Sequence, residues 1–389
     1  MPLLTLALAG IVWLWTAFVY FLELTSLSHI RTYKRNLQEP DPRFQPKVSL
    51  IVPLKGRDDG LEENLRKILD QSLPPREVFF VVDSFRDPAY PLVKKLTKNK
   101  KNIFILTSKP LPASSGKCAA LVTAAEKARG EILVFADSDI MPSRDWLKNL
   151  IQPLHDEETG VSTSYRWYFP LKGNVSSCLA SSWNAKGFGV LFSQKYTFVW
   201  GGSCAIRRER FREWNILSEW KKAVSDDTIL TAYCRRYKKP IHFVAQSVAP
   251  TFASFDWKSF VEWTNRQTAM VRYYDDRLWK LLTGALLLFN FIPLSGIIIL
   301  FLGFPSHLFI IPGFLLLMYP FLSILREWLR MRFFEQILPE YRDYFKKWKG
   351  RVILTSILVN PLFLYNLLKA KKMTSITWRG KEYALYKQV

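Results

Sequence analysis

Two long apolar regions, one at each end of the chain, constrain what this sequence can fold into. The first runs almost without interruption from Leu3 to about Leu24, close to the ~20 residues that a helix needs to cross the core of a bilayer. No basic region precedes it and no clear small-residue cleavage site follows, so an anchoring helix is favoured over a cleaved signal peptide. Basic residues follow the run, and the positive-inside rule then places the section from Lys47 in the cytoplasm.

Further apolar runs lie toward the other end. Leu281 to Leu302 and His307 to Ile324 are each near spanning length and are separated by the turn-forming sequence GFPS, which predicts a membrane hairpin. The last run, Val352 to Leu368, is short and contains Pro361, so a spanning helix and a re-entrant or interfacial helix are equally open. The sequence before the hairpin is aromatic and basic, as in a helix at a membrane surface. These features divide the chain into a transmembrane helix (1–26), a water-facing domain (46–255), an interfacial helix region (256–280), a transmembrane hairpin (281–325), and a basic loop with a membrane-associated or re-entrant helix and a tail (326–389).

The formal charge of +22 is compatible with binding to nucleic acid, which needs a basic surface. Much of the positive charge, however, stands directly beside the apolar runs, which is typical of the cytoplasmic flanks of membrane helices. We therefore expect membrane lipids as partners, no nucleic acid and no obligate protein partner. The cysteines show no CxxC pair and no zinc-ligand spacing, which favours a reducing compartment; they are Cys118, Cys178, Cys204 and Cys234.

Between the apolar ends, short apolar runs alternate with helical patterns. Val48 to Pro53 is a continuous apolar run closed by a proline, as expected of a strand buried on both faces. Similar runs recur at 78–82, 103–106 and 132–135, and the stretches 61–71 and 117–129 between them have helical periodicity. This alternation predicts an α/β fold with a doubly wound, mostly parallel sheet.

Acidic residues stand at the ends of the predicted strands. Asp83 follows one strand, while Asp137 and Asp139 follow another, at the sheet edge where such folds bind ligands. An Asp-x-Asp pair can be a solvated turn, but its position after a buried strand favours a site for a hard divalent cation. Asp226 and Asp227 open a further helix, and from the residues alone they are equally compatible with helix capping and with a general base.

The ordered motifs VSLIVPLKG, VVDSFRDPAY, GKCAAL, FADSDI, WGGSCAIRR, SDDT, WTNRQ and TWRGKEY resemble inverting glycosyltransferases of the family 2 type with the GT-A fold. Within that type the chain is most similar to ceramide glucosyltransferases and their bacterial relatives, from about Pro46 to Tyr383. Two features depart from the family pattern. The sequence WTNRQ keeps only the arginine of the usual motif, and no histidine precedes WGGSC, where Phe192, Ser193 and Gln194 stand.

The resemblance implies a role for each matching position. Asp137 and Asp139 would hold Mn²⁺ or Mg²⁺ with the diphosphate, and Asp227 would be the catalytic base, with Asp226 beside it. Arg379 in the tail would meet the diphosphate. The remaining implied substrate contacts are Pro53 and Lys55 at the base, Asp83 or Asp87 at the base or ribose, Lys117 by the nucleotide-sugar, Gly202 and Cys204 in the floor of the pocket, and Arg266.

These expectations together describe an integral membrane enzyme, in the plasma membrane or in the inner membrane if bacterial, with a cytoplasmic catalytic domain. It would move a hexose from a UDP-sugar, UDP-glucose being favoured, to a lipid hydroxyl. A processive polysaccharide synthase is disfavoured because the membrane helices are too few for an export channel. A nonenzymatic membrane scaffold would be marked by loss of a catalytic carboxylate, and none is lost.

Overall fold

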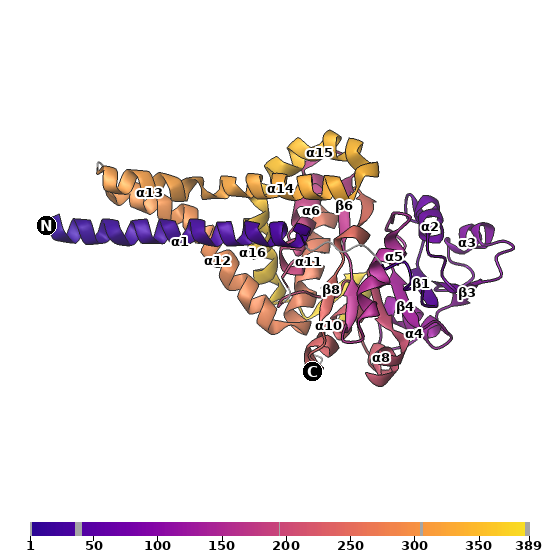
Figure 1. Ribbon diagram of the computed structural model, residues 1–389. Helices are drawn as coiled ribbons and strands as arrows, with labels where there is room; N and C mark the ends of the chain where they lie inside the picture. Colours follow the sequence, from indigo (N-terminus) through magenta and orange to yellow (C-terminus); the bar gives the residue numbers. More distant parts are fainter. Residues whose placement is uncertain (1, 36–40, 194, 304–305, 386–389) are drawn as a thin grey trace. The chain divides into compact units, whose positions relative to one another are not determined.

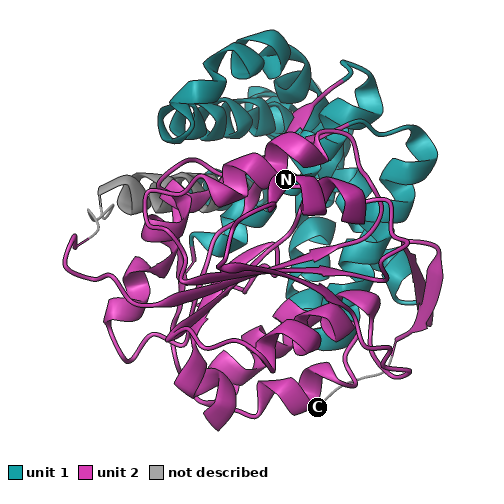
Figure 2. Ribbon diagram, turned by 90° about the vertical axis from the view of Figure 1, so that its right-hand side faces the viewer, with its two compact units in different colours: residues 1–37, 172–192, 254–373 teal, residues 38–171, 193–253, 374–389 magenta. Residues whose placement is uncertain are grey.

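The computed structural model describes residues 2–35, 41–193, 195–303 and 306–385, and the side chains of residues 22–35 lie outside that description. The chain forms two compact units that interleave along the sequence (Figure 2). Unit 1 contains residues 1–37, 172–192 and 254–373, and unit 2 contains residues 38–171, 193–253 and 374–389. Residues 172–192 thus cluster with the apolar helices, and the C-terminal tail clusters with the sheet.

Within the described residues, unit 2 is built on a seven-stranded sheet (Figure 1). Its strands lie in the order β3-β2-β1-β4-β7-β5-β8. Neighbours are parallel except around β7, which runs antiparallel to both β4 and β5, so the predicted mostly parallel α/β sheet is confirmed. In chain order the strands are β1 (Val48–Leu54), β2 (Glu77–Val82), β3 (Ile103–Thr107), β4 (Ile132–Ala136), β5 (Val161–Thr163), β7 (Ser203–Arg207) and β8 (Ile241–Phe243).

The apolar strand sequences follow from burial on both faces. Every residue of β2 and β4 is buried, and α2 and α5 pack their apolar side chains against the sheet in one core with β1. Two smaller sheets, β6 with β9 and β10 with β11, complete the strands of unit 2. The other elements of this unit are α2 (Leu61–Leu69), α3 (Tyr90–Leu96), α4 (Gly116–Ala125), α5 (Trp146–Ile151), η1 (Gln152–His155), β6 (Arg166–Pro170), α8 (Arg208–Glu213), α9 (Ile216–Trp220), α10 (Asp226–Arg236), η2 (Ala245–Ser247), β9 (Ala249–Ala253), β10 (Ser375–Trp378) and β11 (Lys381–Ala384).

The strand order brings three chain segments to one edge of the sheet. β1 and β4 are parallel neighbours, so their carboxyl ends meet where the strand order reverses, and ligands bind at such a point in doubly wound sheets. Because β7 is antiparallel to β4, the beginning of β7 lies at that same edge, with Ser203 paired to Ala136. The backbone N–H of Asp137 donates to the carbonyl of Gly202 across 3.0 Å.

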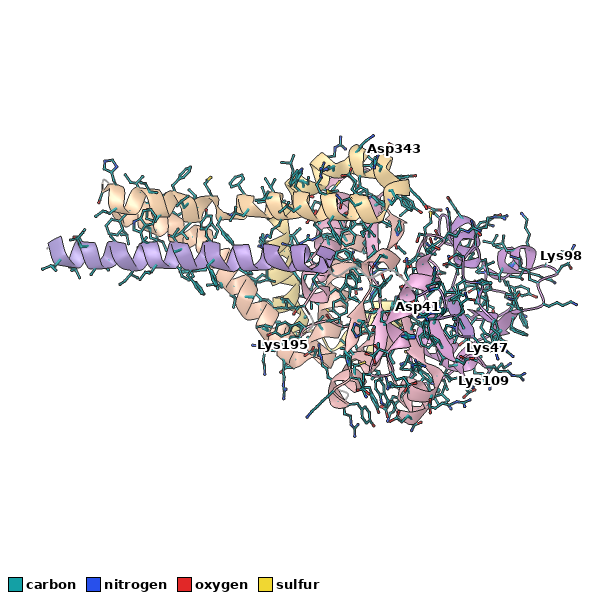
Figure 3. All side chains as sticks on the ribbon, in the orientation of Figure 1. Asp41, Lys47, Lys98, Lys109, Lys195 and Asp343 are labelled. Carbon is teal, nitrogen blue, oxygen red and sulfur yellow. The ribbon has the colours of Figure 1, made fainter. Side chains whose placement is uncertain are left out.

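Unit 1 is helical. Within its described residues, four segments are long and apolar enough to cross a membrane, and these are 3–21, 276–302, 307–337 and 339–370. Many side chains of α12 and of the described part of α1 extend outward from the helices (Figure 3). Leu3 and Phe301 are 84% and 85% exposed, which suits contact with lipid rather than water. Its helices are α1 (Pro2–Arg35), α6 (Val175–Ala185), α7 (Gly187–Leu191), α11 (Trp257–Tyr274), α12 (Asp276–Gly303), α13 (His307–Met318), η3 (Tyr319–Phe321), α14 (Leu322–Ile337), η4 (Pro339–Tyr341), α15 (Arg342–Thr355), η5 (Ser356–Leu358) and α16 (Val359–Ala370).

The predicted membrane hairpin corresponds to α12 and α13, which pack together at small residues. A Cβ on Gly296 would stand 2.6 Å from the backbone nitrogen of Leu317, so only glycine permits this close approach. The second arm is longer than the run 307–324. After a 3-10 turn that contains Pro320, the helix continues as α14, because a proline interrupts the hydrogen-bond ladder without ending the helical direction.

The last apolar run is not a single helix. It begins in α15, passes through the 3-10 turn η5 and ends in α16, which runs across the direction of α1 and α13 (Figure 1). α16 itself has 12 residues, or about 18 Å, while the continuous helical segment 339–370 is long enough to cross a bilayer. Asn366 of α16 is buried and donates to Thr264 (3.0 Å) and Asn265 (2.9 Å) of α11. These contacts hold α16 against α11.

Candidate functional site

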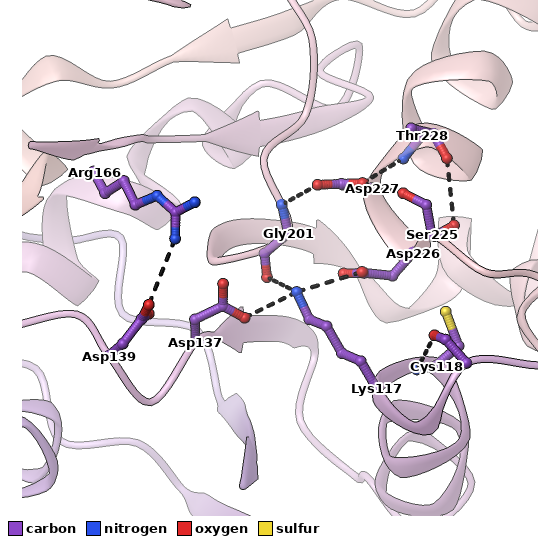
Figure 4. Close-up of polar contacts among 11 residues, drawn as sticks. Lys117, Cys118, Asp137, Asp139, Arg166, Gly201, Ser225, Asp226, Asp227 and Thr228 are labelled. Carbon is purple, nitrogen blue, oxygen red and sulfur yellow. Dashed lines mark hydrogen bonds and ion pairs between the residues drawn. The ribbon is translucent and has the colours of Figure 1, made fainter. Parts of the chain in front are cut away.

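The Asp-x-Asp pair stands where the buried strand β4 ends. Asp139 Oδ2 forms an ion pair with Nη1 of Arg166 at 3.5 Å (Figure 4). Asp139 Oδ1 is buried and has no hydrogen-bond partner among the described residues. Burial raises the pKa of Asp139, and the charge of Arg166 offsets part of that rise. The guanidinium of Arg166 in turn lies over the rings of Tyr168 and Trp200. The Asp-x-Asp pair is therefore partly buried and held by an ion pair, unlike a turn that is fully exposed to solvent.

Lys117, at the beginning of α4, joins three segments of this edge (Figure 4). Its ammonium lies 2.9 Å from Asp137 Oδ1 and 3.4 Å from Asp226 Oδ1, and it donates to the carbonyl of Gly201 at 3.2 Å. Burial alone would lower the pKa of Lys117, but the surrounding carboxylates outweigh burial and raise it well above its usual value. Lys117 therefore stays protonated in the site.

Asp226 and Asp227 open α10, as predicted, but Ser225 is the N-cap residue. Asp226 is 4% exposed, and its Oδ2 is buried and meets no hydrogen-bond partner in the described part of the chain. Asp227 is partly exposed and accepts three hydrogen bonds, from the backbone N–H of Gly201 (2.9 Å), the backbone N–H of Thr228 (2.8 Å) and the hydroxyl of Ser225 (2.5 Å). Asp227 is thus the member of the pair that is both held in place and accessible.

Two glycines let these carboxylates approach the backbone. A Cβ on Gly201 would stand 2.2 Å from Asp226 Oδ2, and a Cβ on Gly202 would stand 2.2 Å from the ring of Trp200 and 2.6 Å from Asp137 Oδ2. Neither position has room for a side chain, which explains the Gly-Gly of the WGGSC motif. Cys204 is buried in β7, opposite Phe135.

The predicted nucleotide contacts lie around the end of β1. Lys55 forms a 2.9 Å ion pair with the exposed Asp83, and Pro53 pairs with Val81 in the sheet. Asp87 is 8% exposed and accepts from the backbone N–H groups of Gly56 (3.0 Å) and Ala89 (2.8 Å). Asp87 therefore shapes the loop, while Asp83 has a carboxylate that a ligand can reach.

The tail returns to the same unit as a β-hairpin. Arg379 and Gly380 form its turn with positive φ angles of 49° and 77°, as tight hairpin turns require. Arg379 donates two hydrogen bonds to Asp58, at 2.8 and 2.5 Å, and the hydroxyl of Tyr383 accepts from the backbone N–H of Gly116 at 3.4 Å. The bond to Asp58 raises the pKa of Arg379, and the charges of Asp139 and Asp137 raise it further, so the tail lies within the field of the Asp-x-Asp pair.

A family model described as glycosyl transferase family 21 matches residues 11–388. The chain belongs to this family. The probable glycosyltransferase YdaM of Bacillus subtilis is 23% identical over 288 residues, which cover 70% of this chain and 68% of YdaM. The ceramide glucosyltransferase of Pyricularia oryzae is 28% identical over 177 residues, which cover 40% of this chain and 36% of that protein. The sequence-based resemblance to ceramide glucosyltransferases and their bacterial relatives is thereby confirmed.

A solved structure also resembles this family 21 glycosyltransferase. It is the mannosyltransferase PcManGT from Pyrobaculum calidifontis in complex with GDP-Man and Mn²⁺. The likeness covers 94% of this chain and 97% of PcManGT, with 17% sequence identity and a TM-score of 0.48.

The Asp-x-Asp pair fits a divalent cation. No cluster of three or more His, Cys, Asp or Glu residues occurs in the part of the chain that the structure describes, and the pair itself offers two carboxylates. Mg²⁺ is commonly held in this way, by one or two carboxylates with phosphate oxygens and water completing the shell, and Mn²⁺ also suits oxygen ligands. The unpartnered, buried oxygen of Asp139 is a ligand of the right chemistry.

Sequence reasoning missed three contacts of the family 21 site. Asp58, Arg166 and Tyr383 show no local pattern, since each gains its role only through a partner far along the chain. Arg266 lies on α11 in unit 1, whereas the other predicted site residues belong to unit 2. Gln194, at the departure before WGGSC, lies outside the described residues.

Asp226→Asn is expected to change how stability depends on pH. Burial, opposed in part by Lys117, raises the pKa of Asp226 from 3.8 to about 6, so the folded protein binds this proton more tightly than the unfolded chain. Ionisation of Asp226 therefore lowers the free energy of unfolding by roughly 3 kcal/mol as pH rises from about 4 to about 6. In detergent, the melting temperature of the variant relative to that of the wild type should rise between pH 4.5 and pH 7. A difference in melting temperature that stayed constant over this pH range would contradict a raised pKa of Asp226.

Proposed function

We propose that this family 21 glycosyltransferase moves a hexose from a UDP-sugar, with UDP-glucose favoured, to a lipid hydroxyl and inverts the anomeric carbon. One observation supports this most strongly. The Asp-x-Asp pair after β4, the Asp226–Asp227 pair of α10 and the Gly201–Gly202 turn before β7 converge on Lys117 at one sheet edge. One part of such a site suits an anionic leaving group, and another part can accept a proton from a hydroxyl group.

The proton-accepting group is Asp227. Each of its oxygens has two lone-pair sites, so the three observed hydrogen bonds leave capacity for the hydroxyl of an acceptor. Asp227 takes that proton as the acceptor oxygen attacks the anomeric carbon in line. A single displacement inverts the configuration and needs no covalent sugar–enzyme intermediate. Asp226, buried beside it and paired with Lys117, keeps the base in position without touching the acceptor.

The part of the site that would bind the nucleotide-sugar donor contains groups that can neutralise a diphosphate. Asp137 and Asp139 would hold Mn²⁺ or Mg²⁺, which supplies charge neutralisation for the leaving nucleoside diphosphate. Arg379 lies in the field of this pair and presents a guanidinium with the planar geometry that binds phosphate oxygens. Lys55 and Asp83, at the end of the neighbouring strands, provide a donor and an acceptor for the base or ribose.

The lipid acceptor is inferred from unit 1. Its four long apolar helices would place the enzyme in a membrane, and a lipid hydroxyl at the membrane surface is the acceptor that such an enzyme meets. The similarity to a ceramide glucosyltransferase supports this choice of acceptor class. Basic residues at the end of α1 and within α15 favour a cytoplasmic catalytic domain, in the plasma membrane or in the inner membrane if the source is bacterial. Arg266 remains a proposed substrate contact.

The proposal is tested by the lipids of a host that expresses the chain. Mass spectrometry should find a new lipid class that is one hexose heavier than a resident lipid and absent from cells that express Asp227→Asn. Membranes from the same cells should consume UDP-glucose, and a chelator should stop them. An unchanged lipid profile with no consumption of any UDP-sugar would contradict the proposal.

The placement of the tail makes a separate prediction about topology. If α16 is interfacial, the hairpin of β10 and β11 stays in the cytoplasm with the catalytic domain. The native cysteines are all buried, so an impermeant thiol reagent should report only introduced ones. Intact cells should leave Lys381→Cys unlabelled and should label Ser306→Cys between α12 and α13; Val389, a natural position for a probe, lies outside the described residues.

Lys98→Cys, on the exposed surface of the catalytic domain, is the matched inside control (Figure 3). It should behave as Lys381→Cys does, protected in intact cells and labelled after lysis. Labelling of Lys381→Cys from outside would place the tail on the other side of the membrane and would remove Arg379 from the site.

A further inference from the structure

The ammonium of Lys117 is surrounded by protein oxygens, more than a lysine that only contacts a ligand would need. An ammonium has three N–H donors, and Lys117 directs them to oxygens from three different elements. These oxygens belong to Asp137 after β4, Asp226 at the start of α10 and Gly201 before β7. The side chain of Lys117 is only 12% exposed.

Local structure alone would not place a lysine here. Lys117 is the second residue of α4, and a cation in the first turn of a helix is unfavourable because the helix dipole is positive there. Burial of an ammonium is also costly unless it is paired. The carboxylates of Asp137 and Asp226 therefore determine its position, and Lys117 acts as their counter-ion.

We propose that Lys117 is a resident counter-ion that competes with the divalent cation for Asp137 and leaves this carboxylate when cation and nucleoside diphosphate bind together. This inference rests on the proposed function, because it assumes that Asp137 and Asp139 hold a cation. A second cation at Asp137 is repelled by the ammonium already beside it. The negative diphosphate relieves this repulsion by offering the ammonium new oxygens. Lys117 thereby couples cation binding to donor binding.

The surroundings of Lys117 allow this exchange. When the ammonium leaves Asp137, Gly201 and Asp226 still offer it a carbonyl and a carboxylate, and Asp226 Oδ2 is a further buried acceptor without a partner. A Cβ on Gly201 would stand 3.0 Å from Nζ of Lys117, so glycine leaves the ammonium room to move. The three acceptors thus form a site with more oxygens than one lysine needs.

The test is Mn²⁺ binding to the full-length protein in detergent, followed by electron paramagnetic resonance, with and without UDP. Without UDP, Lys117→Met should bind Mn²⁺ at least tenfold more tightly than the wild type, because the competing cation is gone. UDP should strengthen Mn²⁺ binding markedly in the wild type and much less in Lys117→Met. Lys117→Arg keeps the charge and should stay near the wild type, and Lys109→Met, an exposed lysine paired with Glu126, is the matched control.

Unchanged or weaker Mn²⁺ binding in Lys117→Met would overturn the inference, since a lysine that only supports the fold would give that result. If the single variant does not fold, Lys117→Met in the Asp226→Asn background removes one positive and one negative charge together. This double variant should then bind Mn²⁺ more tightly than Asp226→Asn alone, and equal or weaker binding would again overturn the inference. Asp139→Ala separates the two claims. If it abolishes Mn²⁺ binding while the lysine variants have no effect, the cation site stands and the competition does not.

Discussion

Asp227→Asn is expected to lower turnover by about 10²- to 10⁴-fold, the usual contribution of a general base, while donor affinity stays nearly unchanged. The base acts on the acceptor hydroxyl, and the contacts of Asp227 go to Gly201, Thr228 and Ser225 rather than to the donor side of the site. Turnover with a fixed lipid acceptor and calorimetry of UDP binding, on the same preparation, measure the two quantities.

Asp145→Asn is the matched control for this variant. Asp145 precedes α5 and accepts from the hydroxyl of Ser72, so the same chemical change is made at a helix N-terminus away from the site. It should leave turnover near the wild-type value. Turnover retained by Asp227→Asn would remove the residue from its assigned role, and loss of UDP binding together with turnover would indicate a structural effect.

Asp139→Ala is expected to remove the dependence of donor binding on metal and to lower the transfer rate at least ~100-fold, since a catalytic cation contributes several kcal/mol. A carboxylate that ligates the ion is coupled to the diphosphate through it. Calorimetry of UDP with and without Mn²⁺ should show a large enhancement by Mn²⁺ in the wild type and none in the variant.

Asp83→Ala is the control that separates metal coupling from ordinary donor binding. Asp83 is an exposed carboxylate at the same sheet edge, paired with Lys55. Its removal should weaken UDP binding by the same factor with and without Mn²⁺. If Mn²⁺ strengthened UDP binding in Asp139→Ala as it does in the wild type, the Asp-x-Asp assignment would fail.

The sequence predicted β1, β2 and β4 closely because burial on both faces leaves an uninterrupted apolar run. The predicted run 132–135 corresponds to β4, which ends at Ala136, so Asp137 and Asp139 were correctly placed at its carboxyl end. The predicted helix 117–129 is α4, which ends earlier, at Ala125. Such elements are encoded within a few consecutive residues, and local periodicity is sufficient to find them.

Features that depend on distant partners were not predictable in this way. The reversal of β7, which brings Gly201 and Gly202 to Asp137, arises from strand pairing and has no local signal. The pairing of Arg166 with Asp139 has the same origin. Pro361 was the only local signal for the break between α15 and α16. The contacts of Asn366 that hold α16 against α11 depend on the tertiary fold.

The central claim is that this site transfers a hexose with inversion to a lipid. Its most direct test is the anomeric configuration of the product that purified enzyme makes from UDP-glucose, in which the sugar is α-linked, and a lipid acceptor in nanodiscs. Nuclear magnetic resonance of the isolated glycolipid should show a β-glycoside, formed by the wild type and not by Asp227→Asn. An α-glycoside, or release of free glucose with no glycolipid, would contradict the account.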